Sequence, residues 1–431
     1  MQIILVTTLV ILRCVTVVLK LTKKGRGTAL PGLLIEKYFP QLIPHIFSKT
    51  PYTILITGTN GKTSTRSFLV KILESKYRVI SNRSGSNMQR GILSEVLSQM
   101  DILGNIKADY AVFEVEEATI PRLSSLLKPK QIIVTNLFRD QLDAYGEIDR
   151  TFNFIQQAVT QSAQATIIIN GDDPRLLALE IHPKSKHFYC GIDDRIVNKF
   201  KYEGQTPSNN EEKLVAREIK VLRNLNTSFK WENYTTTLQL PGYFQVYNAL
   251  YAIKSADLIG IDKDTINRQL QSMRAPFGRG ERVKYKSKDL TIFLIKNPAG
   301  FNLTLNLLTH IENPTLVFIL NDRIADGKDV SWIWDSSLEV VSKIAPKSIY
   351  CVGERAEDML LRIKYSLTGT LLEEGNYYKD TNSTTRVYLC KEQKRLLKYL
   401  ENEQSSEIFI MATYTAMLEL RKLLTGNALN V

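Results

Sequence analysis

The stretch that decides the fold is Tyr52-Thr-Ile-Leu-Ile-Thr57, followed without a break by Gly58-Thr-Asn-Gly-Lys-Thr63. The first six residues are mostly apolar or β-branched, as in a short buried strand. The next six form a glycine-containing turn, and a helical pattern follows from about residue 64 to residue 75. Glycines let the backbone wrap closely around phosphate oxygens, toward which the N–H groups of the loop and helix point. This order of strand, loop and helix therefore predicts a phosphate-binding loop.

The loop also carries side chains suited to nucleotide chemistry. Lys62 would reach the β- and γ-phosphates, and the Thr63 hydroxyl would bind Mg²⁺. Only two residues separate Gly58 from Gly61, so the spacing is shorter than in the general phosphate-loop motif. The loop residues expected to contact the nucleotide are Gly58, Thr59, Asn60, Gly61, Lys62, Thr63 and Ser64.

The composition indicates a globular chain of more than one domain. At about 150 residues per domain, 431 residues favour two or three domains. The hydrophobic fraction of 44% and the charged fraction of 23% exclude wholesale disorder, a collagen-like repeat and a polytopic membrane protein. Four widely spaced cysteines argue against a disulfide framework and indicate reduced thiols in the cytoplasm. They are Cys14, Cys190, Cys351 and Cys390.

The formal net charge of +12 favours anionic partners such as nucleotides, diphosphate substrates and phospholipid surfaces. The chain has no long Lys/Arg tract and no strip of alternating aromatic and basic residues. Nucleic acid is therefore not an expected partner.

Strand-like and helical segments alternate along both halves of the chain, which predicts an α/β fold with a parallel sheet. Residues 187–236 break this alternation and are interpreted as an insertion with a few strands. The segment Ala275-Pro-Phe-Gly-Arg-Gly280 is typical of a hinge. We expect an N-terminal helical segment packing on the central domain, a central nucleotide-binding domain and a smaller Rossmann-like α/β domain. Their expected bounds are 1–46, 47–278 and 279–431.

The N-terminus allows two interpretations. Residues 1–19 are apolar except for Arg13, and the basic residues Lys20, Lys23, Lys24 and Arg26 follow. Arg13 would lie near the centre of a bilayer at a cost of about 2.5–3.5 kcal/mol, which argues against a membrane span. A buried helix on the first domain or a peripheral contact with the inner face of the membrane fits better.

Six segments of the first half form a pattern of motifs around the loop. They are Thr57-Gly-Thr-Asn-Gly-Lys-Thr-Ser64, Val112-Phe-Glu-Val-Glu-Glu117, Thr135-Asn-Leu-Phe-Arg-Asp-Gln-Leu-Asp143, Asn170-Gly-Asp-Asp-Pro174, Leu240-Pro-Gly-Tyr-Phe-Gln-Val-Tyr-Asn248 and Gly278-Arg279. In these segments the chain resembles the Mur ligases, the ATP-dependent amide-forming enzymes of peptidoglycan biosynthesis. The resemblance implies that ATP binds at the loop, that Glu114 binds Mg²⁺, that Asn248 packs on the adenine and that Arg279 reaches the nucleotide. Gln141 departs from these ligases, which have histidine there.

A second set of segments lies mostly in the second half of the chain. They are Leu294–Asn302, Leu320–Asp335, Gly353–Met359, Ala412–Met417 and Glu116-Glu117-Ala118. In these segments the chain resembles one branch of the Mur ligases, the MurT family, the ligase subunits of lipid II isoglutaminyl synthases. This resemblance implies a heterodimer with a GatD-type glutaminase that supplies ammonia. The chain would phosphorylate the α-carboxylate of D-isoglutamate in the lipid II stem peptide, with Lys62 and Glu114 catalytic, and ammonia would give D-isoglutamine.

The resemblance further implies that an aspartate of this chain completes the Cys-His pair of the partner. Asp335 is the first candidate, before Asp329 and Asp326; alternatively, Asp335 caps a helix. The adjoining Trp332 and Trp334 fit either an interface or a core. The chain has no convincing glutaminase of its own, because no histidine lies in a recognisable motif near a cysteine.

The insertion departs from the family pattern, because many MurT proteins carry a four-cysteine zinc ribbon there. Only Cys190 falls within residues 187–236, so no Cys₄ site can form and no structural zinc is expected. Two alternatives to the amidotransferase subunit stay open. One is a free-standing Mur-type amino-acid ligase acting on a UDP-linked precursor, and the other is a non-enzymatic binding module.

Overall fold

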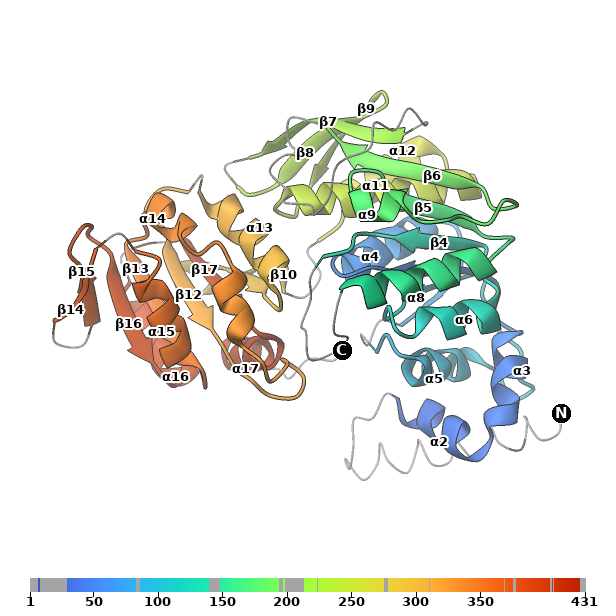
Figure 1. The fold of residues 1–431 in the computed structure, drawn as a ribbon, viewed down its shortest axis with the longest axis horizontal. Coiled ribbons are helices and arrows are strands. Elements are labelled where there is room, and N and C mark those ends of the chain that lie inside the picture. The colour runs from blue at the N-terminus through green and yellow to red at the C-terminus, as the bar shows by residue number, and fades with distance from the viewer. Residues whose placement is uncertain are drawn as a thin grey trace.

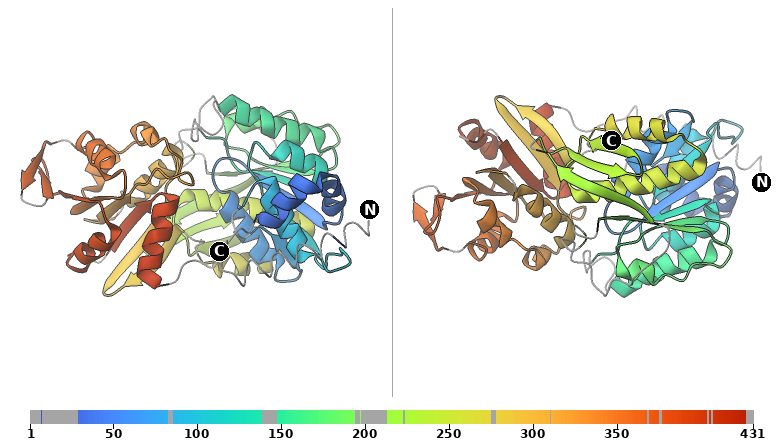
Figure 2. Two further views of the ribbon diagram at one scale, coloured as in Figure 1. Left: turned by 90° about the horizontal axis from the view of Figure 1, so that it is seen from below. Right: turned by 90° about the horizontal axis from the view of Figure 1, so that it is seen from above.

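The computed structural model describes residues 29–82, 86–138, 148–193, 213–222, 224–274, 278–309, 311–367, 369–374, 377–403 and 407–426, with the single residues 7, 197 and 405. These residues form two α/β units, each built around one sheet (Figure 1). Figure 2 shows the two units side by side from below and from above. The apolar N-terminal segment with its basic cluster and the segment containing Gln141 lie outside the described residues.

The first sheet is built on β1 (Tyr52–Thr57), the predicted strand before the loop. β1 pairs in parallel with β3 (Tyr110–Glu114) and β4 (Gln131–Val134). All three strands are apolar and almost fully buried, as expected for a parallel sheet covered on both faces. The strand order is β2-β3-β1-β4-β5-β6-β7-β8-β9. The further parallel strands are β2 (Val79–Ser81), β5 (Thr166–Asn170) and β6 (His187–Ile192).

Helices cover both faces of this sheet (Figure 1). On one face α4 (Lys62–Leu73) packs against α11 (Tyr243–Ile259), whose buried residues point in all directions because neighbouring elements surround it. α12 (Lys263–Gln271) joins this layer. The other face carries α2 (Leu30–Tyr38), α3 (Ile43–Phe47), α5 (Gln89–Gln99), α6 (Ile120–Leu127) and α8 (Ile148–Gln161), with the short η1 (Pro40–Leu42) and α9 (Pro174–Leu177) nearby.

The described part of the 187–236 segment extends the first sheet, and the predicted strands are present. β7 (Lys213–Val221) continues the parallel pairing, whereas β8 (Thr227–Trp231) and β9 (Tyr234–Leu238) are antiparallel. The Trp231 ring is buried, and its Nε1 donates a hydrogen bond of 2.8 Å to Thr236 Oγ1. A packed aromatic core therefore stabilises this part of the segment. The absence of zinc stays a prediction.

The second sheet has the order β10-β11-β17-β12-β13-β16-β15-β14. Its strands are β10 (Arg279–Tyr285), β11 (Lys288–Leu294), β12 (Thr315–Ile319), β13 (Ser348–Val352), β14 (Leu371–Glu374), β15 (Tyr377–Asp380), β16 (Arg386–Cys390) and β17 (Glu407–Ala412). The central strands β11, β17, β12, β13 and β16 are parallel, whereas β10 at one edge and the pair β15 and β14 at the other end of the sheet are antiparallel. The α/β class expected for both halves is thus confirmed, while the exact boundary at residues 278 and 279 stays a prediction.

The helices of the second unit also lie on two faces. One face carries α13 (Pro298–Leu308), the 3₁₀ helix η2 (Ser331–Asp335), α14 (Val340–Ile344) and α15 (Ala356–Lys364). The other face carries α16 (Gln393–Glu401) and α17 (Tyr414–Thr425). Within the described ranges, no helix is both long enough and apolar enough to cross a bilayer.

Candidate functional site: a phosphate loop between two α/β units

The phosphate loop follows β1 directly and leads into α4, and two of its glycines are required by geometry. Gly58 and Gly61 have φ angles of +116° and +90°, which side-chain-bearing residues rarely adopt. A Cβ atom on Gly58 would lie 2.4 Å from Thr135 Oγ1, and one on Gly61 would lie 2.2 Å from Asn248 Oδ1. The loop therefore packs tightly against the end of β4 and against α11, without room for a methyl group.

Asn136, just beyond the end of β4, holds the loop in shape through three hydrogen bonds. Its Oδ1 accepts from the Asn60 amide at 2.9 Å, its Nδ2 donates to the Asn60 carbonyl at 2.9 Å, and its own carbonyl accepts from the Thr59 amide at 2.9 Å. The sequence marked Asn136 only as part of a family-like segment. Its function as a brace for the loop depends on a contact across 76 residues of chain.

Lys62 is held at the base of the loop by two short contacts. Its Nζ donates to the Gly58 carbonyl at 2.7 Å and forms an ion pair with Glu117 Oε1 at 2.7 Å. Both side chains are nearly buried. Burial raises the pKa of Glu117, whereas the positive charge of Lys62 acts in the opposite direction. The sequence did not assign Glu117 to the site, because nothing in its pattern shows which charge it faces.

The two predicted metal ligands provide oxygen atoms that suit Mg²⁺. Glu114 is 3% exposed, and its Oε2 lies 3.4 Å from Arg66 Nε but accepts no hydrogen bond. The Arg66 guanidinium thus forms an ion pair with this oxygen without a hydrogen bond, and the oxygen can still accept a donor or a cation. Thr63 follows Lys62 in the first turn of α4, and carboxylate and hydroxyl oxygens are the hard ligands that Mg²⁺ prefers. These residues fit the metal. The described residues contain no group of three or more His, Cys, Asp or Glu side chains that could hold a metal ion, so Glu114 and Thr63 form only part of a ligand set.

We expect Glu114→Gln to raise the Mg²⁺ concentration needed for half-maximal ATP binding by about tenfold or more, the loss typical of damaged metal sites. The amide keeps the shape of the side chain but removes the negative charge. Calorimetric titration of ATP at a series of Mg²⁺ concentrations measures the change. Asp109→Asn, at the opposite end of β3, is the matched control. An unchanged Mg²⁺ requirement in the Glu114 variant would remove this residue from the metal site.

A pocket of about 670 Å³, open to solvent, lies between the loop and the second unit. Asn60, Gly61 and Ser64 line it from the loop side, together with Asn248 and Arg279. Five of the predicted nucleotide contacts thus share one pocket, while Gly58, Thr59, Lys62 and Thr63 do not line it. The lining residues not predicted from sequence are Asn136, Phe138, Asn170, Phe244, Tyr247, Gly278, Phe293, Leu294, Gly300, Leu303 and Thr304. Aromatic and amide side chains together suit a flat heterocycle.

The second unit approaches the loop through the N-terminus of α13. Asn297 caps this helix by accepting a hydrogen bond of 2.9 Å from the Gly300 amide. The Nδ2 atom of the same side chain donates to Asn60 Oδ1 at 3.2 Å. Asn60 Nδ2 is buried and has no hydrogen-bond partner among the residues that the structure describes. Residues of both units therefore contact any molecule that fills the pocket.

Arg279 lies where β10 begins and lines the same pocket. Burial lowers the pKa of its guanidinium, and the charge of Glu114 counteracts this effect. The predicted nucleotide arginine and the predicted metal ligand are thus close enough to interact electrostatically. Arg66, which lies beside Glu114, was not predicted because helical periodicity gives no partner for it.

Gly61→Ala is expected to weaken ATP binding by about 10- to 100-fold, as estimated from the 1–3 kcal/mol of a strained backbone residue. Gly260→Ala is the matched control, because Gly260 has the same φ of +90° but no atom within 4 Å of the position that an added Cβ would take. Both variants should lose some thermal stability, but only Gly61→Ala should lose nucleotide-induced stabilisation. Equal ATP affinities in the two variants would contradict the placement of the loop in the nucleotide site.

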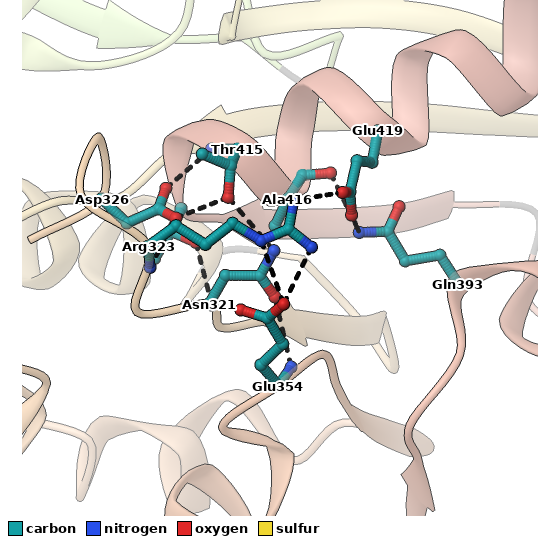
Figure 3. A network of polar contacts seen from close by, with 9 residues as sticks. Asn321, Arg323, Asp326, Glu354, Gln393, Thr415, Ala416 and Glu419 are labelled. Carbon is teal, nitrogen blue, oxygen red and sulfur yellow. Dashed lines mark hydrogen bonds and ion pairs between the residues drawn. The ribbon is translucent and has the colours of Figure 1, made fainter. Parts of the chain in front are cut away.

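The three aspartates considered for the partner's active site have different surroundings. Asp326 is nearly buried and is engaged by Thr415, whose amide donates to Asp326 Oδ1 at 2.7 Å and whose hydroxyl donates to Oδ2. Figure 3 shows this contact beside Arg323, which bridges Glu354 and Glu419. Asp326 thus stabilises the start of α17, which makes it a poor candidate for a second role.

Asp329 and Asp335 are more accessible. Asp329 accepts the Ser331 amide at 2.8 Å, and hydrogen bonds from Ser331 lower the pKa of its carboxyl group. Asp335 is exposed at the end of η2 and forms no hydrogen bond or ion pair with the described residues. It caps no described helix, since α14 begins only at Val340. The geometry therefore favours Asp335 among the three.

The described cysteines are unsuitable as nucleophiles. Cys190, Cys351 and Cys390 are buried, and burial raises the pKa of each thiol, to about 12 for Cys190. A thiolate is the reactive form, so these groups stay protonated and inert at neutral pH.

Fold and site together define a two-unit α/β protein of the Mur ligase type. The model of the Mur ligase middle domain matches residues 56–256, and the model of the MurT ligase C-terminal domain matches residues 294–417. MurF from Acinetobacter baumannii superimposes with a TM-score of 0.68 at 16% identity, covering 93% of this chain and 80% of that one. MurF from Thermotoga maritima, solved in complex with ADP, superimposes with a TM-score of 0.63 at 14% identity, covering 89% and 81%.

The C-terminal match separates the chain from the other Mur ligases. The lipid II isoglutaminyl synthase (glutamine-hydrolyzing) subunit MurT of Streptococcus pneumoniae (strain ATCC BAA-255 / R6) is 30% identical over 94% of each chain. The chain belongs to the MurT family.

Proposed function

We propose that this chain is the ATP-dependent synthetase subunit of a lipid II isoglutaminyl synthase. It converts the α-carboxylate of D-isoglutamate in the lipid II stem peptide to the amide of D-isoglutamine. The observation that carries the proposal is one pocket shared by a phosphate loop and a MurT-type second unit. The name of the Streptococcus pneumoniae relative, lipid II isoglutaminyl synthase subunit MurT, supports the same reaction.

The chemistry requires activation, because a carboxylate is a poor electrophile for ammonia. Transfer of the γ-phosphoryl group of ATP makes an acyl phosphate, from which ammonia displaces phosphate. Such a transfer depends on positioning and charge neutralisation more than on covalent catalysis. Lys62 would neutralise charge on the phosphates, and the loop amides from Gly58 to Ser64 would position them.

The remaining site residues have proposed roles around this transfer. Glu114 and Thr63 would hold Mg²⁺, which supplies charge neutralisation and orientation of the phosphates when bound. Asn248 and Arg279 would contact the nucleotide from α11 and β10. The Thermotoga maritima MurF, a protein of the same fold, was solved in complex with ADP, which supports nucleotide binding by the present chain.

Ammonia would come from a partner, a GatD-type glutaminase that forms a heterodimer with this chain. Buried thiols with raised pKa values argue against glutamine hydrolysis by Cys190, Cys351 or Cys390. The word "subunit" in the relative's name supports the presence of a partner. Because lipid II is membrane-bound, we place the heterodimer in the cytoplasm at the inner face of the membrane.

The synthetase half of the proposal can be tested without the partner. The chain alone, supplied with ATP, Mg²⁺, lipid II and an ammonium salt, should release ADP only when all four are present. ADP release with a free amino acid and a UDP-linked precursor, but not with ammonia and lipid II, would assign the chain to the free-standing ligases instead. ATP-induced thermal stabilisation without any turnover would indicate a binding module.

A further inference from the structure

The second unit contacts the phosphate loop through a side chain that makes two different kinds of contact. Asn297 is fully buried at the start of α13. Its Oδ1 accepts a hydrogen bond of 2.9 Å from the Gly300 amide, and its Nδ2 donates to Asn60 Oδ1 at 3.2 Å. The first contact caps the helix, and a serine or an aspartate would cap it about equally well. Of these two contacts, only the second requires an amide side chain.

A backbone amide fixes the direction of both hydrogen bonds. The Gly300 N–H can only donate, so the atom of Asn297 that faces it must be the side-chain oxygen. The nitrogen of Asn297 therefore faces Asn60, and the atom of Asn60 that accepts its hydrogen bond must again be an oxygen. The amide of Asn60 is thus oriented by the second unit, although Asn60 belongs to the loop of the first unit.

This orientation leaves the Asn60 Nδ2 atom as an unused donor. The atom is buried and has no hydrogen-bond partner within the described part of the chain, which is costly for a polar group. Asn60 and Gly300 both line the pocket between the two units. A molecule in this pocket that carries acceptor oxygens would satisfy the donor, and the phosphates of a nucleotide carry such oxygens.

The backbone of Asn60 is fixed within the first unit, so only its side-chain amide depends on the second unit. Thr135 Oγ1 donates to the Asn60 carbonyl at 2.7 Å, and Asn136 binds both the amide and the carbonyl of Asn60. On the other side, Leu303 of α13 packs against the apolar core of the first unit, which keeps the start of this helix beside the loop. Both partners of the contact between Asn297 and Asn60 are therefore anchored.

We infer that Asn297 is a positioning residue for ATP, because it orients the Asn60 amide so that Nδ2 of Asn60 donates to a phosphate oxygen. This inference rests on the proposed function, which supplies the nucleotide. Asn60 contacts the phosphate, and Asn297 acts through Asn60. A donor that is oriented in advance needs no reorganisation when the phosphoryl group is transferred. The second unit would thereby determine whether the loop presents a donor or an acceptor to the phosphates.

The test measures the ATP affinity of variants of the full chain by calorimetry in the presence of Mg²⁺. Asn297→Ser keeps a helix cap but loses the donor to Asn60, and it should weaken ATP binding by about tenfold, the order expected for one hydrogen bond to a charged group. Asn297→Asp also keeps the cap, but its carboxylate repels Asn60 Oδ1 and turns the Asn60 amide over. An acceptor would then face the phosphates, so ATP should bind more weakly to Asn297→Asp than to Asn297→Ser.

A double-variant cycle tests whether Asn297 acts through Asn60. Asn60→Ala should weaken ATP binding by about tenfold or more, and adding Asn297→Ser to Asn60→Ala should cause no further loss. Asn306→Ser and Asn306→Asp, at an exposed position of the same helix, are the matched controls and should bind ATP like the unchanged chain. Thermal unfolding without nucleotide should be nearly the same in both Asn297 variants, because the helix cap is kept.

Failure of the inference and failure of the proposed function give different results. Unchanged ATP affinity in both Asn297 variants would mean that Asn297 is only a helix cap, which overturns the inference and leaves the proposed function intact. Losses that multiply in the double variant, or unchanged affinity in Asn60→Ala, would overturn it as well. If the affinities follow the expected pattern but the unchanged chain releases no ADP with lipid II and ammonia, the positioning role stands and the proposed function is wrong. No ATP binding by the unchanged chain would refute both.

Discussion

Lys62→Ala is expected to reduce ATP-dependent amidation by about 10²–10³-fold or more, the loss found when one pre-organised transition-state donor is removed. Lys62 is the loop side chain expected to neutralise charge on the transferred phosphoryl group. The rate of amide formation with saturating ammonia measures this effect without any contribution from the partner. Lys71→Ala, an exposed lysine on the same helix, is the control and should retain normal activity.

A loss of activity must be separated from a loss of fold, because Lys62 also pairs with the buried Glu117. Breaking one side of a buried ion pair leaves an uncompensated charge and can cost about 3–5 kcal/mol. The double variant Lys62→Ala/Glu117→Gln removes that charge and should recover stability without recovering amidation. Partner binding should persist in the double variant. Amidation at a near-normal rate in either variant would refute the phosphate-loop assignment.

The second large effect is expected for Asp335→Asn, which should lower glutamine hydrolysis by the heterodimer by about 10²–10⁴-fold. An aspartate that orients a catalytic histidine and stabilises its charged form contributes on this order in hydrolases with such a triad. Asparagine keeps the size of the side chain but removes the charge. Amidation of lipid II driven by an added ammonium salt should be unchanged, because the phosphate loop belongs to the other unit of the chain.

Asp329→Asn is the matched control, since Asp329 uses its carboxylate to accept the Ser331 amide. Its substitution should leave glutamine hydrolysis within a few-fold of normal. If Asp335→Asn retains full glutaminase activity while Asp329→Asn loses it, the supporting carboxylate is Asp329. Loss of ammonia-driven amidation in Asp335→Asn would instead show that the residue serves the synthetase reaction.

Features that depend on short stretches of chain were predictable from sequence. The strand Tyr52–Thr57 and the helix that begins after it are confirmed, because apolar runs and glycine-containing turns act locally. The α/β class and the family are confirmed as well. The strands β14 and β15 were not predicted, since Leu371–Glu374 and Tyr377–Asp380 are short, largely polar segments with little alternation. The edge strand β10 (Arg279–Tyr285) was not predicted either, because most of its residues are polar.

Contacts between distant segments could not be predicted. Glu117 lies 55 residues from Lys62, and Asn136 lies 76 residues from Asn60; only the order of the strands brings them together. The same holds for Arg362 of α15, whose Nε donates a hydrogen bond of 3.1 Å to the Ile333 carbonyl across 29 residues of chain. The sequence left both Trp332 and Trp334 open between core and interface, and the structure separates them into one buried and one exposed ring.

The central claim is tested most directly by mass spectrometry of lipid II after incubation with the chain and a co-expressed GatD-type subunit. ATP, Mg²⁺ and glutamine are supplied, and each component is omitted in turn. The account predicts the mass change of one hydroxyl group replaced by one amino group on the stem peptide, only when ATP, glutamine and both subunits are present. Unchanged lipid II under complete conditions, together with ADP release on a UDP-linked precursor and a free amino acid, would contradict it.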